Sequence, residues 1–170
     1  MAVPKQVRGA VALIAQLIVL LALLGAFFVR FYPVLGPSME PQFSSGEFTI
    51  INTLAYRLGA PQRSDIIAFL HHSEGAEQTF IKRIIGLPGD RVSIDRGIVI
   101  RNGSPLQEPY VVHHDTHSMP AITVGPGQLF VLGDNRSNSE DSRVFGTIPT
   151  SDVVGRAIAI VWPLHRATRL

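Results

Sequence analysis

The chain has 170 residues, no cysteine and a formal net charge of +2. This length favours one compact domain, and the lack of cysteine excludes a disulfide framework, a thiol nucleophile and a thiolate metal site. So small a net charge gives no argument for nucleic-acid binding, and we expect no nucleic-acid partner.

One continuous apolar run, AVALIAQLIVLLALLGAFFV, occupies residues 10–29. As a helix it would be about 30 Å long, which matches the hydrocarbon core of a bilayer. A cleaved signal peptide is the alternative, but its apolar run is shorter and ends at small residues. This run ends at Phe28, Val29 and Arg30, so we predict a retained transmembrane anchor at 10–29.

The charges around the apolar run predict its orientation. Lys5, Arg8 and the terminal amine precede the run, and only Arg30 follows it closely. This bias predicts that residues 1–9 form a cytoplasmic tail, because positive flanks stay on the cytoplasmic side. Residues 31–170 are then expected to form one extracytoplasmic domain.

Beyond Phe31 the sequence changes to short alternating stretches bounded by Gly, Pro, Asn and Asp, which is typical of antiparallel strands. From about residue 104 to 127 the chain is more polar, so we expect a small surface excursion near 95–127. The predicted fold class is mostly β, a single N-terminal transmembrane helix followed by an antiparallel β-sheet domain. The expected strands are 47–52, 66–70, 78–85, 91–94, 97–101, 128–132 and 153–161.

The segment GPSMEP at residues 36–41 follows the predicted anchor closely. Two prolines restrict the backbone on either side of Ser38, so its hydroxyl would be held in place. A loop serine more often only hydrogen-bonds its own backbone. The segment alone leaves both interpretations open.

The segment TFIKRIIGLPGD at residues 79–90 reads as a strand that ends in a turn. Alternation puts Phe80, Lys82 and Ile84 on one face and Arg83 on the other, so a buried face must contain a cation. A buried lysine can lose its proton, whereas an arginine effectively cannot. To act as a base near pH 7, Lys82 needs a pKa about three units below 10.4, which is roughly 4 kcal/mol. The alternative is an edge lysine with its ammonium in water.

The third segment, LGDNRSNSEDSR at residues 132–143, concentrates hydrogen-bonding side chains in one loop. Its carboxylates could bind calcium, but the spacing lacks the central glycine of a calcium loop, and Arg136 and Arg143 oppose a cation. Zinc at His113, His114 and His117 is disfavoured because that stretch has no helical periodicity and no nearby carboxylate motif. We expect no metal and no cofactor.

These three segments, in this order after an apolar run, resemble those of type I signal peptidases. The resemblance extends from the predicted anchor to about Trp162. It implies that Ser38 is the nucleophile, Lys82 the general base and Ser139 the residue whose hydroxyl orients the lysine. Met39 would support the wall of the substrate pocket.

The resemblance also implies supporting residues and two departures. Asp141 and Arg143 would form a charged pair that braces the site together with Arg83. Gln42 stands where the family usually has threonine. Gly36 stands where some members have a hydroxyl residue that completes the oxyanion hole, so the backbone N–H of Ser38 would need another donor.

By resemblance, the chain is expected to be a serine endopeptidase that removes signal peptides from secretory preproteins through an acyl-enzyme. It would act on the outer face of a bacterial cytoplasmic membrane, with preproteins and the lipid bilayer as its partners. The cut would follow a small residue that has another small residue two positions earlier.

Three other classes remain open. A self-cleaving repressor shares the Ser/Lys pair but carries a DNA-binding helical module where this chain has its apolar run. A membrane-tethered β module that only binds would leave the apolar surroundings of Lys82 unexplained. A specialised processing peptidase of a conjugation or organelle system is the third, although no arginine- and serine-rich transit segment precedes the run. The oligomeric state is not indicated.

Overall fold

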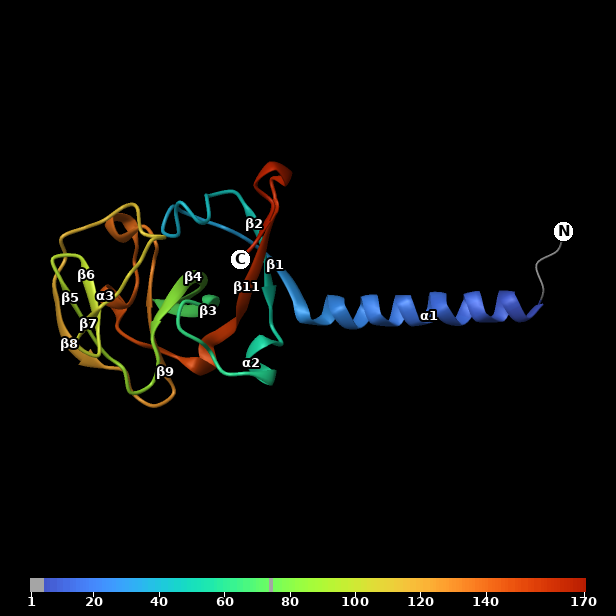
Figure 1. Cartoon of the computed structure of the whole chain (residues 1–170), viewed down its shortest axis with the longest axis horizontal. Coiled ribbons are helices and arrows are strands. Elements are labelled where there is room, and N and C mark those ends of the chain that lie inside the picture. Colours follow the sequence, from blue (N-terminus) through green and yellow to red (C-terminus); the bar gives the residue numbers. More distant parts are fainter. Residues whose placement is uncertain (1–4, 74) are drawn as a thin grey trace.

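The computed structural model describes residues 5–73 and 75–170. Helix α1 (Lys5–Phe28) projects as a single rod from a β-rich body that contains the described residues after Phe28 (Figure 1). Residues 1–4 of the expected tail lie outside the described residues. In the part of the chain that is described, no helix combines the length and the apolarity that a membrane span requires.

The larger of two sheets is eight-stranded and antiparallel throughout. Its strand order is β1-β2-β11-β3-β4-β9-β10, and β12 pairs with β11 off this path. Neighbouring strands are therefore often far apart in sequence. The strands are β1 (Val29–Pro33), β2 (Phe48–Asn52), β3 (Ile66–Ser73), β4 (Ala76–Gly86), β9 (Gln128–Leu132), β10 (Ile148–Pro149), β11 (Val153–Trp162) and β12 (Thr168–Arg169).

The second sheet is four-stranded, and three of its strands lie within the expected excursion near 95–127 (Figure 1). This stretch is less superficial than its polarity suggested, because Val111 and Val124 are buried. Its order is β7 (Ser104–Pro105), β6 (Ile98–Arg101), β5 (Arg91–Asp95) and β8 (Met119–Thr123).

Strand β4 lies between hydrophobic clusters on both of its faces. Ile81 packs against one cluster, which includes the buried residues Met39 and Phe43. Ile84 belongs to a second cluster, and Ile85 to a third that joins the two sheets. The polar side chains in the middle of β4 therefore lie next to apolar clusters.

The predicted mostly β fold is confirmed, and each strand expected from the sequence is present. Strands β1, β7, β8, β10 and β12 were not predicted. Val29 was assigned to the end of the apolar run, but the helix ends at Phe28 and Val29 begins β1. The remaining helical elements are short: α2 (Ala55–Leu58), α3 (Ser142–Phe145), η1 (Arg136–Asn138), η2 (Thr150–Asp152) and η3 (Leu164–Arg166).

Candidate active site

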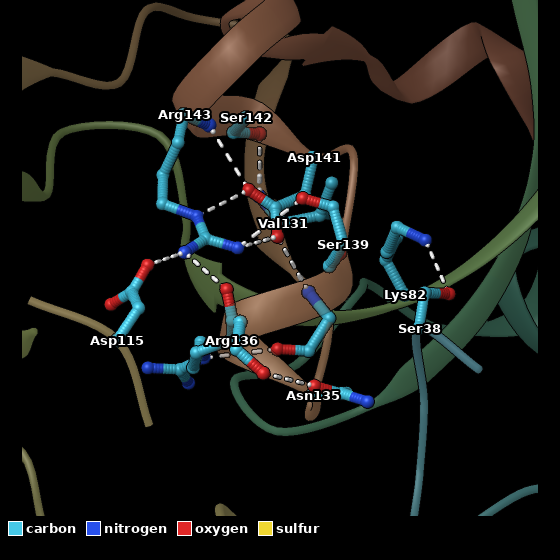
Figure 2. Close-up of polar contacts among 12 residues, drawn as sticks. Ser38, Lys82, Asp115, Val131, Asn135, Arg136, Ser139, Asp141, Ser142 and Arg143 are labelled. Carbon is cyan, nitrogen blue, oxygen red and sulfur yellow. Dashed lines mark hydrogen bonds and ion pairs between the residues drawn. The ribbon is translucent and has the colours of Figure 1, made fainter. Parts of the chain in front are cut away.

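Ser38 and Lys82, far apart in the sequence, lie in direct contact. Ser38 belongs to the loop that joins β1 to β2, and Lys82 lies in the middle of β4. Lys82 Nζ donates a hydrogen bond to Ser38 Oγ at 2.7 Å (Figure 2). A hydroxyl and an amine at this separation can exchange a proton directly.

The loop that carries Ser38 is held on both sides of the serine. Within the loop, Phe43 N–H donates to Met39 O at 2.9 Å, and both side chains are buried. From the polar loop, Asn135 donates its backbone N–H to Ser38 O at 3.1 Å and its side-chain amide to Pro37 O at 3.2 Å. Ser38 is thereby fixed in place, as the flanking prolines suggested.

Lys82 is in an unusually dry environment for an amine. Only 4% of the residue is exposed, and the Phe80 ring centroid lies 5.1 Å from Nζ. Burial lowers the pKa of Lys82 from 10.5 to about 8, although the charges of Asp141 and Glu140 oppose this shift. The shift is smaller than three units, but it leaves an appreciable neutral fraction near pH 7.

Arg83, on the other face of β4, is also buried, and its partner differs from the expected one. Its guanidinium donates from Nε and Nη2 to Asp134 at 2.8 and 2.6 Å, and from Nη1 to Ser64 O at 3.1 Å. It also lies over the Tyr110 ring, 4.0 Å from the centroid. The expectation that Arg83 joins Asp141 and Arg143 is corrected, because β4 pairs Arg83 with Leu132 and so brings it beside Asp134.

Asp141 and Arg143 form the expected charged pair. Arg143 donates from Nε and Nη2 to the two carboxylate oxygens of Asp141, at 2.8 and 2.7 Å (Figure 2). Asp141 also accepts the N–H of Gly133 at 3.0 Å. Desolvation tends to raise the pKa of Asp141, but the hydrogen bonds and charge of Arg143 outweigh it, and the pKa is lowered. A fully buried carboxylate thus stays ionised and holds the start of the polar loop.

Ser139 lies near the pair but does not hydrogen-bond to Lys82. Its hydroxyl is buried and makes no hydrogen bond of ordinary geometry among the described residues, although its contact with Asp141 helps to lower the pKa of that carboxyl. A Cβ on Gly133 would lie 2.2 Å from Ser139 Oγ and 2.5 Å from Ser38 O, so the loop passes the serine as closely as glycine permits. The orienting role of Ser139 stays a prediction.

Two carboxylates of the excursion were missed by the sequence analysis. Glu108 accepts two hydrogen bonds from Arg136, at 2.9 and 2.7 Å, and Asp115 accepts one from Arg143. Figure 2 shows Arg143 between Asp115 and Asp141. The polarity of residues 104–127 suggested exposure, whereas these two charges are used to clamp the polar loop.

A small cavity of about 210 Å³ adjoins the Ser38–Lys82 contact. Its apolar wall includes Val34, Leu35, Met39 and Ile81. Beside it, β4 pairs with β9 only from Arg83 onward, so residues 79–82 have no strand partner on that side within the described chain. A larger cavity of about 650 Å³, lined by Asp65 and Arg156 among others, does not include the Ser38–Lys82 contact. Among the described residues, no group of three His, Asp or Glu side chains could hold a metal.

Fold and site together define a class of protein. A fixed serine hydroxyl that contacts a desolvated lysine amine, beside an apolar cavity and a free strand edge, is an arrangement in which a lysine can serve as the base of a serine hydrolase. The family model described as signal peptidase, peptidase S26, matches residues 7–162. The chain belongs to this family.

Two relatives, similar over most of the chain, agree with this membership. The chain is 41% identical to a probable signal peptidase I-1 of Synechocystis sp. over 155 residues, which cover 86% of this chain and 78% of that protein. It is 36% identical to a signal peptidase I of Bacillus caldolyticus over 159 residues, covering 85% and 86% respectively. A crystal structure of a signal peptidase I from Enterococcus faecalis matches with a TM-score of 0.49 and 36% identity, over 56% of this chain and 95% of that one.

The activity follows from the family. The chain is a serine peptidase that cleaves signal peptides, and signal peptides are its substrates. Signal peptidases I are membrane-anchored enzymes, as the resemblance found in the sequence already implied.

Proposed function

We propose that Ser38 and Lys82 carry out the cleavage of signal peptides as a nucleophile and its general base. The observation that carries this proposal is the 2.7 Å contact between a fixed hydroxyl and an amine whose pKa burial lowers to about 8. Lysine at this pKa is a competent base, because an appreciable fraction is neutral at the pH of the reaction.

In the first step, neutral Lys82 takes the proton of Ser38 Oγ as the oxygen attacks the carbonyl of the scissile peptide bond. The oxyanion that forms accepts a hydrogen bond from the Ser38 backbone N–H, for which the described residues offer no other acceptor. The Gly36 N–H is already donated to Ser45 Oγ at 3.2 Å, so it is not the second donor in this conformation.

The same lysine serves the remaining steps. Protonated Lys82 gives its proton to the leaving amine, and the signal peptide stays bound to Ser38 as an ester. Lys82 then accepts a proton from a water molecule that attacks this ester and releases the acid. Neither half of the reaction needs histidine or a metal.

We propose that the substrate binds as an added strand along residues 79–82 of β4, where the edge is unpaired. Alternate side chains of an added strand point the same way, so one would enter the 210 Å³ cavity beside Ser38. The buried Met39 closes that cavity and favours small side chains. The cut would then follow a small residue.

We propose further that the apolar run at residues 10–29, which α1 covers as far as Phe28, anchors the enzyme in a bacterial cytoplasmic membrane, with residues 31–170 outside. Apolar side chains are exposed around this helix, for example Leu13 at 68% and Leu17 at 55%. A helix with such a surface is unstable in water and stable in lipid. The anchor would keep the site near the membrane, where the apolar segment of the preprotein lies.

The test of the Ser/Lys assignment is cleavage of a model preprotein in detergent by wild type, Ser38→Ala and Lys82→Met, with a chelator present. We expect wild type to cut at the signal junction and both variants to be inactive but folded. Cleavage by Ser38→Ala, or loss of wild-type activity on chelation, would overturn the assignment.

The test of the topology uses the absence of native cysteine. Arg8→Cys and Ser104→Cys are exposed single-cysteine variants that can be labelled in intact cells by a membrane-impermeant maleimide. The proposal expects labelling of the second variant only, with both labelled after lysis. Labelling of Arg8→Cys in intact cells would contradict it.

A further inference from the structure

The loop that carries Ser38 has a second anchor, which comes from the C-terminal segment. Arg166 lies in η3, beyond the last residue that the family model matches. Its Nε donates to Glu47 Oε1 at 2.8 Å, and its Nη2 donates to Pro41 O at 3.2 Å. In Figure 1 the C-terminal turn (red) lies beside β2, at the end of β2 where the loop enters.

Glu47 is the point through which Arg166 acts on the loop. The residue is 3% exposed, and its other carboxylate oxygen accepts the Ser44 N–H at 2.9 Å. Its backbone is paired as well, because Val34 N–H donates to Glu47 O at 2.8 Å and Glu47 N–H donates to Ser44 O at 3.2 Å. Glu47 thus ties the start of the loop, at Val34, to its end, near Ser44.

Removing the partner of a buried carboxylate destabilises a fold more than removing the partner of an exposed one. Arg166 is itself 41% exposed, so an isolated surface pair of this kind would contribute little. Glu47 is not on the surface, however, and without Arg166 its buried charge would keep, among the described residues, one hydrogen-bond donor, the Ser44 N–H. The loop is then expected to open toward water to hydrate the carboxylate.

We propose that Arg166 is a positioning residue for Ser38, which acts by locking Glu47 and Pro41. Asn135 fixes the loop at Pro37 and Ser38, and Arg166 fixes it at the other end. Arg166 lies outside the cavity beside Ser38, so it affects the placement of the hydroxyl and not the binding of substrate. The catalytic part of this inference rests on the proposed role of Ser38.

The first arm of the test is steady-state cleavage of a signal-junction peptide by Arg166→Gln, Arg166→Lys and the matched control Arg169→Gln, which removes a charge from the same segment. We expect Arg166→Gln to lower kcat per folded molecule by about tenfold with KM within about twofold, because small errors in the position of a nucleophile are costly. Arg166→Lys keeps the charge but not the paired donors, so its kcat should be about threefold lower than that of wild type. Arg169→Gln should match wild type.

The second arm does not depend on catalysis. Amide hydrogen exchange is measured on Ser38→Ala with and without Arg166→Gln, and the melting temperature confirms that each variant is folded. We expect exchange in residues 38–47 to rise by about tenfold, with β5 and β6 unchanged.

Unchanged exchange in 38–47, a kcat within twofold of wild type, or an equal loss in Arg169→Gln would overturn the positioning role. If Ser38→Ala still cleaves, the proposed nucleophile is wrong, and the exchange arm still decides whether Arg166 fixes the loop.

Discussion

Replacing Phe80 by serine should move the pH dependence of catalysis to higher pH. The ring of Phe80 lies 5.1 Å from Lys82 Nζ and forms part of the apolar wall around it. Serine would admit water to this wall and stabilise the ammonium form of the lysine. The matched control is Gln78→Ala, an exposed position two residues earlier on the same strand.

The size of the effect follows from the pKa of Lys82. Its fall from 10.5 to about 8 corresponds to about 3 kcal/mol, which is the net of desolvation and the opposing charges of Asp141 and Glu140. At pH 7 about 9% of such a lysine is neutral, against about 0.03% of an unperturbed one, so burial supplies about 300 times more base. If Phe80→Ser moves the titration up by about one pH unit, kcat/KM at pH 7 falls about tenfold and approaches wild type above about pH 10.

The assay is kcat/KM from pH 6 to 10.5 with a signal-junction peptide that has no group titrating in this range. Wild type and Gln78→Ala should show a limb that rises with pH and bends near pH 8, because the neutral lysine is the active form in the proposed mechanism. An unmoved limb in Phe80→Ser, with activity reduced equally at every pH, would refute the link between desolvation and base strength.

Four further predictions concern stability, packing and metals. Lys82→Met should stabilise the fold by about 3 kcal/mol at pH 7. Between about pH 8 and 10.5 the unfolded wild-type chain binds more protons than the folded one, so the free energy of unfolding of wild type rises with pH across that window. The stability advantage of Lys82→Met over wild type should therefore shrink across the window and disappear above it. Urea titrations of both proteins at pH 7 and 10.5 measure this difference. Gly133→Ala should abolish cleavage, because its Cβ would lie 2.5 Å from Ser38 O, whereas Gly125→Ala, with its nearest neighbour at 3.6 Å, should be active. Asp141→Asn should lower the free energy of unfolding, measured by urea titration, by about 3 kcal/mol, because the buried guanidinium of Arg143 loses its charged partner. The control Glu140→Gln, at the exposed neighbouring position, should lower it by less than about 0.5 kcal/mol. Cleavage should be unchanged after dialysis against a chelator, and loss of activity that added zinc restores would contradict a metal-free mechanism.

The β fold was predictable because most of its longer strands show alternating hydrophobicity and are bounded by turn residues in the local sequence. Residues 78–85 alternate and end at Pro88-Gly89, and β4 occupies nearly the same stretch. The short strands β7, β10 and β12 have only two residues each, which is too few for a periodic signal. They are strands only because a longer strand lies beside them.

The candidate catalytic pair was predictable from motifs, but its supports were only partly so. The sequence suggested that one face of β4 is buried, and clusters on both faces bury Lys82 and Arg83 alike. The partner of Arg83 depends on the register between β4 and β9, which local spacing does not report. The roles of Glu108 and Asp115 were not predictable for a related reason. A carboxylate in a polar stretch is expected to be exposed, and the local sequence does not show that Arg136 and Arg143 pair with these two residues in the fold.

The contact between Arg166 and Glu47 is the extreme case, since 119 residues separate its partners. Nothing near either residue distinguishes it from other surface charges in the sequence. The contact exists because β11 runs beside β2 and returns the chain to the loop that carries Ser38.

The most direct test of the central claim is to trap the acyl-enzyme. Nitrophenol is a better leaving group than an amine or the serine alkoxide, so we expect a nitrophenyl ester of a short peptide ending in alanine to acylate faster than the ester intermediate is hydrolysed. Wild type should then release a burst of nitrophenol equal to the enzyme concentration. Mass spectrometry of the acid-quenched enzyme should then find the acyl group on Ser38, and Ser38→Ala should give neither burst nor adduct. An adduct on any other residue, or an equal burst from Ser38→Ala, would contradict the account.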